Sequence, residues 1–233
     1  MVRKILLTAL LTGVLFIQDA NAQGIDFGLS LNGGFPQGSF KNNVESNGFG
    51  FDAVIGYNLP RMPVTVGLNL GYINYGSSSR FESFSPNIPE VTVRVKTTNN
   101  ILTTHLFTRL EAPVGPVKPY VDGLVGFNYL FTESKVTDDD FEEPIASTTN
   151  FDDAAFSYGV GTGLKIKLGE SVNAENGRLA RWYLDLRARY LLGGEAEYLR
   201  EGSLQRSGST LIFDTRRSKT DLLTFGVGFS VEF

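Results

Sequence analysis

The sequence contains no cysteine and only one histidine among its 233 residues. Without cysteine the chain can form neither disulfides nor thiolate metal sites, and it cannot carry the lipid-modified cysteine of a lipoprotein. The single histidine, His105, excludes a metal site built from several imidazoles. Beyond residue 22 the chain also lacks an apolar run of the roughly 20 residues that a membrane-spanning helix needs. If it crosses a membrane, it must do so as β-strands closed into a barrel.

The start of the chain has the features of a secretory signal peptide. Residues 2–4 are basic in character, residues 5–17 are apolar, and Ala20 and Ala22 form a small-x-small cleavage site. The apolar stretch is too short for a transmembrane helix. We therefore expect residues 1–22 to be removed and residues 23–233 to form one domain.

The charge of the mature chain is mildly acidic. The loss of Arg3, Lys4 and Asp19 from 21 basic and 25 acidic residues leaves 19 and 24. Nucleic-acid-binding domains are instead strongly basic on at least one face. We therefore expect no nucleic-acid partner.

Eight segments of the mature chain alternate between apolar residues and polar or small ones, which is the period of a β-strand. Each is bounded by clusters of Gly, Pro, Asn, Asp or Ser. Most are close to the 9–11 residues that cross a bilayer as a tilted strand. The predicted strands cover approximately residues 24–33, 48–57, 64–75, 96–110, 118–132, 154–168, 181–193 and 220–233.

The connections between these strands alternate in length. Short ones that contain proline lie at 58–63 and 111–117, and 169–180 is intermediate. In bacterial outer-membrane barrels the short turns face the periplasm and the long loops face outward. The long connections are 34–47, 74–95, 132–153 and 194–219.

With its strands and loops in this order, the chain resembles the small outer-membrane barrels of the OmpA-like and OmpW-like type. It resembles most of all the outer membrane protein beta-barrel domain proteins of Bacteroidetes-like bacteria. Residues 113–132 (PVGPVKPYVDGLVGFNYLFT) and 156–168 (FSYGVGTGLKIKL) carry this resemblance. It implies an all-β fold: an eight-stranded antiparallel up-and-down transmembrane β-barrel in the cell outer membrane. It also implies that Phe229, Val231 and Phe233, on the apolar face of the last strand, form the signal read by the barrel-assembly machinery.

Charged residues occupy the face of the strands opposite the apolar one and are expected to point into the lumen. An eight-stranded barrel is only wide enough for side chains to fill it, and buried charges are tolerated when they are paired. We therefore predict an ion-pair network that largely closes the lumen. Its members are Asp52, Arg109, Asp122, Lys165, Lys167, Asp185, Arg187, Arg189 and Glu232.

Residues 132–153 carry a cluster of acidic side chains, a composition that can bind calcium through carboxylate oxygens. However, Glu143 stands where an EF-hand loop requires glycine. We interpret the segment as a solvated acidic loop and predict neither a metal nor a cofactor.

His105 is expected to point into the lumen. Barrel enzymes that modify lipid A are of similar size and would need a histidine with a nearby serine and carboxylate. No His-x-Ser pattern accompanies His105. We therefore expect no catalytic residues and no enzymatic activity.

The last loop is basic. Its arginines and lysine could contact the anionic groups of lipopolysaccharide or could simply keep the loop soluble, and the sequence does not separate the two readings. These residues are Arg200, Arg206, Arg216, Arg217 and Lys219.

Together these features favour a non-enzymatic structural or surface-interaction barrel with long outer loops. Outer-membrane lipid, lipopolysaccharide and the assembly machinery are its expected partners. Two alternatives stay open. One is a narrow channel for small or hydrophobic solutes, as in the OmpW-like family, and the other is an accessory barrel of a secretion system, similar to the PorT-like proteins.

Overall fold

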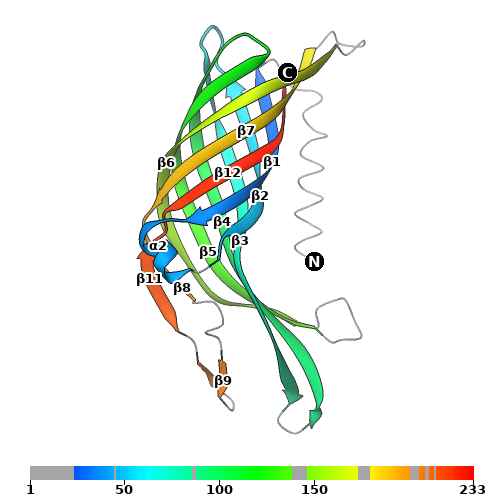
Figure 1. Cartoon of the computed structure of the whole chain (residues 1–233), viewed down its shortest axis with the longest axis vertical. Coiled ribbons are helices and arrows are strands. Elements are labelled where there is room, and N and C mark those ends of the chain that lie inside the picture. The colour runs from blue at the N-terminus through cyan, green and yellow to red at the C-terminus, as the bar shows by residue number, and fades with distance from the viewer. Residues whose placement is uncertain are drawn as a thin grey trace.

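The computed structural model describes residues 24–44, 46–85, 88–137, 146–172, 179–199, 205–207, 210–212 and 214–233. Eight strands of this part close into one antiparallel barrel, in the order β1-β12-β7-β6-β5-β4-β3-β2 (Figure 1). The ring closes where β1 pairs with β12. The predicted all-β, eight-stranded up-and-down barrel is therefore confirmed. Its strands are β1 (Ile25–Pro36), β2 (Gly48–Asn58), β3 (Val64–Ser85), β4 (Ile88–Glu111), β5 (Val117–Thr137), β6 (Ala146–Val172), β7 (Leu179–Gly193) and β12 (Leu222–Glu232).

The smaller elements are α2 (Gly38–Asn43), β8 (Glu195–Leu199), β9 (Gln205–Ser207), β10 (Thr210–Ile212) and β11 (Thr215–Lys219). They lie at one end of the barrel, which we call the loop end (Figure 1). The opposite end, the turn end, carries Phe233 and the connections at 59–63 and 112–116. No helix in the described part of the chain is long and apolar enough to span a membrane.

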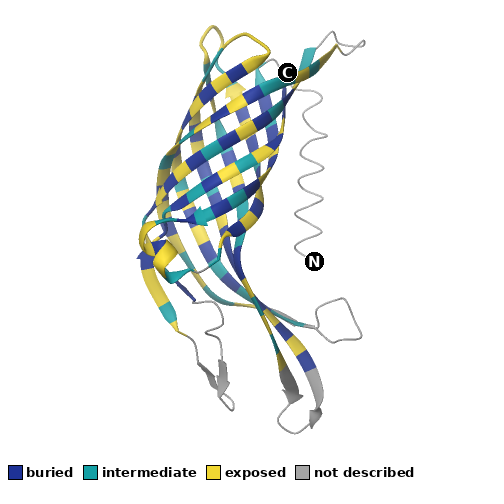
Figure 2. Ribbon diagram, viewed as in Figure 1, coloured by how far each residue is buried: buried dark blue, intermediate teal, exposed yellow. Residues whose placement is uncertain are grey.

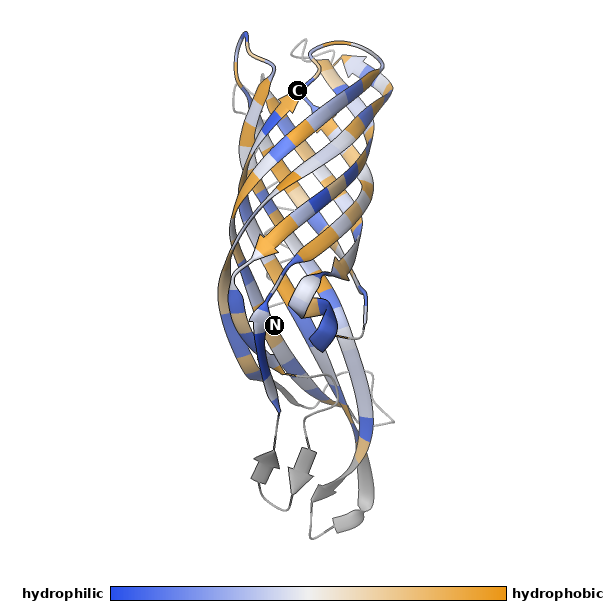
Figure 3. Cartoon of the chain, turned by 60° about the vertical axis from the view of Figure 1, so that its left-hand side comes forward, coloured by the Kyte–Doolittle hydropathy of each residue, from blue (hydrophilic) through white to orange (hydrophobic). Residues whose placement is uncertain are grey.

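The alternation of the sequence becomes an alternation of exposure in the barrel wall (Figure 2). Large apolar side chains such as Leu106, Val160 and Phe229 are 62–67% exposed, while the residues between them face inward. Hydrophobic and hydrophilic residues alternate along the strands (Figure 3), and the large hydrophobic ones are those exposed on the outside of the barrel. A surface of this kind is solvated by lipid rather than by water.

Four strands, β3 to β6, extend well beyond their predicted bounds at the loop end. β3 and β4 remain paired from the barrel out to the contact of Ser85 with Ile88, and β6 begins at Ala146. The predicted loops 74–95 and 132–153 are thus largely strand where they are described. In the β4 extension the apolar face is turned inward and the exposed face carries Arg94 and Lys96, so the apolar outer face that identified the membrane-crossing parts is missing there.

Glycines on the inward face allow neighbouring strands to approach closely. A β-carbon added to Gly126 in β5 would collide with the backbone carbonyl oxygen of Thr104 in β4. Gly123 of the same strand is instead exposed on the outward face, and a β-carbon added there would meet no atom within 4 Å. The close approach of β4 and β5 therefore requires glycine at position 126 but not at position 123.

We expect Gly126→Ala to destabilise the folded barrel by about 1–3 kcal/mol, because the colliding atom is backbone and cannot rotate away. Gly123→Ala is the matched control and should leave stability unchanged. Urea unfolding in lipid vesicles, followed by the mobility of unboiled samples on gels, measures both variants. Equal stability of the two would contradict the close approach at Gly126.

Candidate functional site

The lumen gathers charged side chains from strands around the whole ring. Eight of the predicted residues are buried there: Asp52, Arg109, Asp122, Lys165, Asp185, Arg187, Arg189 and Glu232. Asp26, Glu111 and Lys118 join them and were missed from the sequence. Asp26 lies between the apolar residues Ile25 and Phe27, so strand phase could have identified it. Glu111 lies in the predicted short connection 111–117.

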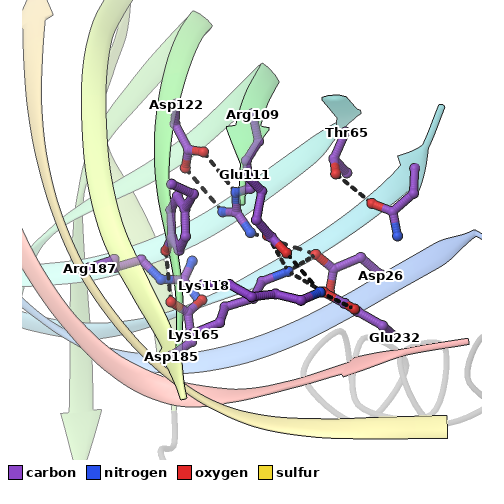
Figure 4. Close-up of polar contacts among 12 residues, drawn as sticks. Asp26, Thr65, Arg109, Glu111, Lys118, Asp122, Lys165, Asp185, Arg187 and Glu232 are labelled. Carbon is purple, nitrogen blue, oxygen red and sulfur yellow. Dashed lines mark hydrogen bonds and ion pairs between the residues drawn. The ribbon is translucent and has the colours of Figure 1, made fainter. Parts of the chain in front are cut away.

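At the turn end, two lysines lie among three carboxylates (Figure 4). Lys165 Nζ is 2.7 Å from Asp26, 2.8 Å from Glu111 and 3.0 Å from Glu232. Lys118 Nζ is 2.7 Å from Glu232 and 3.2 Å from Glu111. These contacts join β1, β4, β5, β6 and β12 across the lumen.

Arg109 connects this cluster to the middle of the barrel. Its Nε donates to Asp122 at 2.8 Å and a terminal nitrogen donates to the other oxygen at 3.0 Å, which is a bidentate pair. The same guanidinium lies 3.6 Å from Asp26 and stacks 3.8 Å from the centre of the Tyr120 ring. One side chain therefore belongs to both halves of the network.

The second half is centred on two arginines of β7. Arg187 lies 3.1 Å from Asp52 and 2.9 Å from Asp185. Arg189 lies 3.2 Å from Asp52 and 3.6 Å from Asp122. The phenol of Tyr120 donates to Asp185 at 2.7 Å. Cations and carboxylates nearly balance, so the buried charges neutralise one another across the lumen.

Lys167 is the exception among the predicted lumen residues. The pairing of β6 with β7 shifts by one residue between Lys167 and Gly169. The side chain of Lys167 is 32% exposed and pairs with Glu170 at 2.6 Å instead of entering the network. This ammonium lowers the pKa of Glu170. Lys167 keeps its predicted strand phase, since it stands opposite the buried Tyr183. It lies at the end of the regular pairing, where its side chain is partly exposed, so it pairs with Glu170 rather than with the buried network.

Carboxylates of the turn-end cluster also form the kind of group that can bind a divalent cation. Asp26, Glu111 and Glu232 offer oxygens that all lie within 4.8 Å of one another. Lys165 and Lys118 already contact these carboxylates, so lysine ammoniums supply the compensating positive charge. The arrangement is that of an ion-pair cluster rather than a metal centre.

His105 has a serine partner that the sequence did not predict. Strand pairing places Ser157 of β6 across Gly126 from His105, and the Ser157 hydroxyl lies 3.0 Å from Nε2. Both side chains are fully buried, and Nδ1 has no hydrogen-bond partner among the described residues. A nucleophile needs a base held by a third group and access to substrate. This pair has neither.

A hydrophobic cluster that includes Phe40 of α2 covers part of the loop end. Phe40 has no exposed surface and contacts the rings of Tyr75 and Tyr198, at centroid distances of 5.6 and 5.3 Å. Ile101 and Leu130 from the barrel wall complete the contact. The first long connection was predicted as a loop; a short helix instead covers this part of the mouth.

The other residues singled out in the sequence do not belong to the lumen network. Ala20, Ala22, Arg200 and the acidic residues 138–143 fall outside the described residues. Phe229 and Phe233 are exposed on the outer face of β12 and its end, whereas Val231 is buried. Their reading by the assembly machinery stays a prediction.

The described acidic residues of 132–153 also have partners within the chain. Asp153 accepts hydrogen bonds from the backbone of Ala154 and Glu197 at 2.8 and 2.7 Å, and Glu133 pairs with Lys135. None of them belongs to a group able to hold a metal in the described part of the chain.

We expect Asp122→Asn to destabilise the barrel by about 3–5 kcal/mol, because Arg109 would keep a buried charge without its bidentate partner. The double variant Arg109→Met/Asp122→Leu should recover most of this loss. Lys167→Gln is the control on the exposed pair and should have no measurable effect. Urea unfolding in vesicles gives the three values. A harmless Asp122→Asn would show that the network does not stabilise the fold.

Solved barrels with little sequence identity are similar to this chain. Neisserial surface protein A is 13% identical with a TM-score of 0.46, and the alignment covers 91% of this chain and 98% of that one. Ail, the attachment invasion locus protein of Yersinia pestis, is 14% identical with a TM-score of 0.32, covering 89% and 96%. The N-terminal β-barrel domain of Pseudomonas aeruginosa OprF is 14% identical with a TM-score of 0.30, covering 89% and 98%. No curated protein matches the sequence.

A family model covers almost the whole chain. The model for the outer membrane protein beta-barrel domain matches residues 7–233. The closed ring of eight antiparallel strands and the apolar outer face agree with it. The chain therefore belongs to the outer membrane protein beta-barrel domain family and is a protein of the cell outer membrane.

Proposed function

We propose that the protein is a non-conducting barrel with a structural or surface-interaction role, oriented with its turn end in the periplasm and its loop end outside the cell. The single observation that supports this most is the continuous ion-pair network across the lumen, from Lys165 at the turn end to Arg189. A conducting pore needs a water-filled path. Paired side chains and the Phe40 cluster fill the positions that such a path would use.

Extended strands support the surface-interaction part of the proposal. β3 and β4 have 22 and 24 residues, about twice the roughly 9–11 that cross a bilayer. Their outer halves therefore stand beyond the barrel as a paired hairpin (Figure 1). A rigid projection of this kind is suited to contact with material outside the membrane.

The proposal predicts that the purified protein reconstituted in planar bilayers gives no discrete current steps. Ion pairs cross the lumen and the Phe40 cluster covers part of its mouth, so we expect conductance to stay at the level of protein-free bilayers. The double variant Phe40→Ala/Arg187→Ala removes one side chain from the cluster at the mouth and one from the ion-pair network. If both obstruct the path of ions, this variant should show a higher open probability than the unaltered protein. Stable current steps in the unaltered protein would favour the narrow-channel alternative.

Orientation can be tested by cysteine labelling, because the chain has no cysteine of its own. Ser79→Cys, on the extended hairpin, should react with a membrane-impermeant maleimide on intact cells. Met62→Cys, in the exposed turn between β2 and β3, should react only after cell lysis. The reverse pattern would place the loop end in the periplasm and reject the orientation.

The absence of enzymatic activity is also part of the proposal. His105 and Ser157 are buried among lumen side chains, and no carboxylate orients the imidazole among its described hydrogen bonds. We expect the lipid A of cells that carry His105→Ala to have the same mass spectrum as that of cells with the unaltered protein. A species that disappears in this variant but persists in Asn69→Ala, a neighbouring inward position, would support an enzyme.

A further inference from the structure

The outward face of the strand extensions carries a group of cations that the sequence pattern did not single out. Lys96 of β4 lies directly opposite Lys135 of β5, and Arg94 lies opposite Phe81 of β3. The Arg94 guanidinium is 5.3 Å from the centre of the Phe81 ring. Arg94, Lys96 and Phe81 are exposed, and the Lys135 side chain is 40% exposed. We call these four residues the cationic strip.

Like charges placed directly opposite each other destabilise a sheet. Lys135 has Glu133 at 3.2 Å, but Lys96 has no ion-pair partner among the described residues. The strip therefore carries more positive than negative charge at one spot. An anion bound between Lys96 and Lys135 would remove the repulsion between them.

The position of the strip relates it to the membrane surface. On the outer face of β4, Leu102 belongs to the apolar band, and Tyr129 stands beside it on β5. Asn100, at the next position of this phase, is fully buried and accepts hydrogen bonds from the Tyr72 hydroxyl at 2.7 Å and from the Asn74 amide at 2.8 Å. The half-buried Thr98 follows, and then come the exposed cations. This order, from an apolar band through tyrosine rings and neutral polar residues to cations, matches hydrocarbon, interface and headgroup in a lipid leaflet.

The distances are also compatible with this match. Lys96 stands six residues beyond Leu102, which is roughly 20 Å along a strand and roughly 15 Å above the apolar band for a strand tilted by about 40°. A lysine side chain can reach several ångströms back towards the membrane. Phosphate groups attached to the sugars of an outer-leaflet glycolipid lie within that reach.

The basic residues of the last loop are different. Arg217 pairs with Glu195 at 3.3 Å, and Arg216 pairs with Asp214 at 3.0 Å. Lys219 stands opposite Glu195 on the same small hairpin. Because acidic neighbours meet these charges within the chain, this hairpin is the weaker candidate for anion binding.

We propose that the cationic strip binds the phosphate groups of a phosphorylated glycolipid of the outer leaflet, with lipid A as its simplest form. Lys96 and Lys135 contact one phosphate from two strands, and Arg94, held against Phe81, provides a planar donor beside them. This inference depends on the proposed orientation of the loop end, but not on whether the lumen conducts.

The experiment uses the purified full chain in vesicles of phosphatidylcholine that contain either phosphorylated lipid A or lipid A stripped of its phosphates. After gentle extraction, native mass spectrometry counts the lipid A molecules retained by each barrel. Lys96→Gln/Lys135→Gln should lower retention of phosphorylated lipid A by about tenfold, given the usual strength of lysine at an anionic surface. Arg216→Gln/Arg217→Gln removes the same charge from the last loop and should change retention less than about twofold.

Two comparisons keep the outcome interpretable. Lys96→Arg/Lys135→Arg should bind as the unaltered protein does, and all variants must show the folded mobility on unboiled gels. Equal retention of the dephosphorylated lipid, or an equal loss in the Arg216/Arg217 variant, would overturn the proposal. Labelling of Ser79→Cys reports the orientation separately. A wrong orientation can therefore be distinguished from a failure of the strip to bind lipid.

Discussion

Closure of the sheet between β1 and β12 is the constraint on which the rest of the molecule depends. In a membrane each backbone amide and carbonyl needs a partner within the protein, and an open sheet edge would leave a row of them unpaired. Once eight strands close, the radius of the lumen is fixed. Each inward side chain must then fit into a narrow space and find its partner there.

The interior chemistry follows from that space. Charged residues from strands far apart in the sequence face one another, and the contacts between Lys165 and Asp26 or Arg187 and Asp52 span more than a hundred residues. Such pairs do not make the interior more favourable than an apolar one would be, because desolvation offsets much of the attraction. The charged residues nevertheless depend on one another, because the loss of one leaves its partner buried without a compensating charge. Arg109 is the clearest case because it contacts carboxylates of both halves.

The two ends of the barrel differ for a related reason. Short turns at one end leave little chain beyond the wall, whereas at the loop end β3, β4, β5 and β6 continue as a sheet after the barrel has stopped curving around them (Figure 1). The outer face of this sheet keeps the phase of the lipid-facing residues but exchanges apolar side chains for cations. An extra residue opposite β4, between Asn74 and Gly76, turns Tyr75 inward to the cluster around Phe40. One irregularity thus helps to close the mouth while the outer face stays continuous.

The sequence by itself determined the strand count, the up-and-down order and the inward position of most lumen charges, because period-2 alternation is a local property that lipid on one side and a packed lumen on the other enforce. It determined neither which charges pair nor that Ser157 meets His105, since those contacts join separate strands and depend on register. Lys167 has the predicted phase, but it lies at the end of the regular pairing and meets Glu170 of its own strand instead of the network. The helix α2, the reach of β3 and β4, and the meeting of Lys96 with Lys135 were decided only by the tertiary structure, because each results from contacts across the fold rather than from the repeat of residues along one strand.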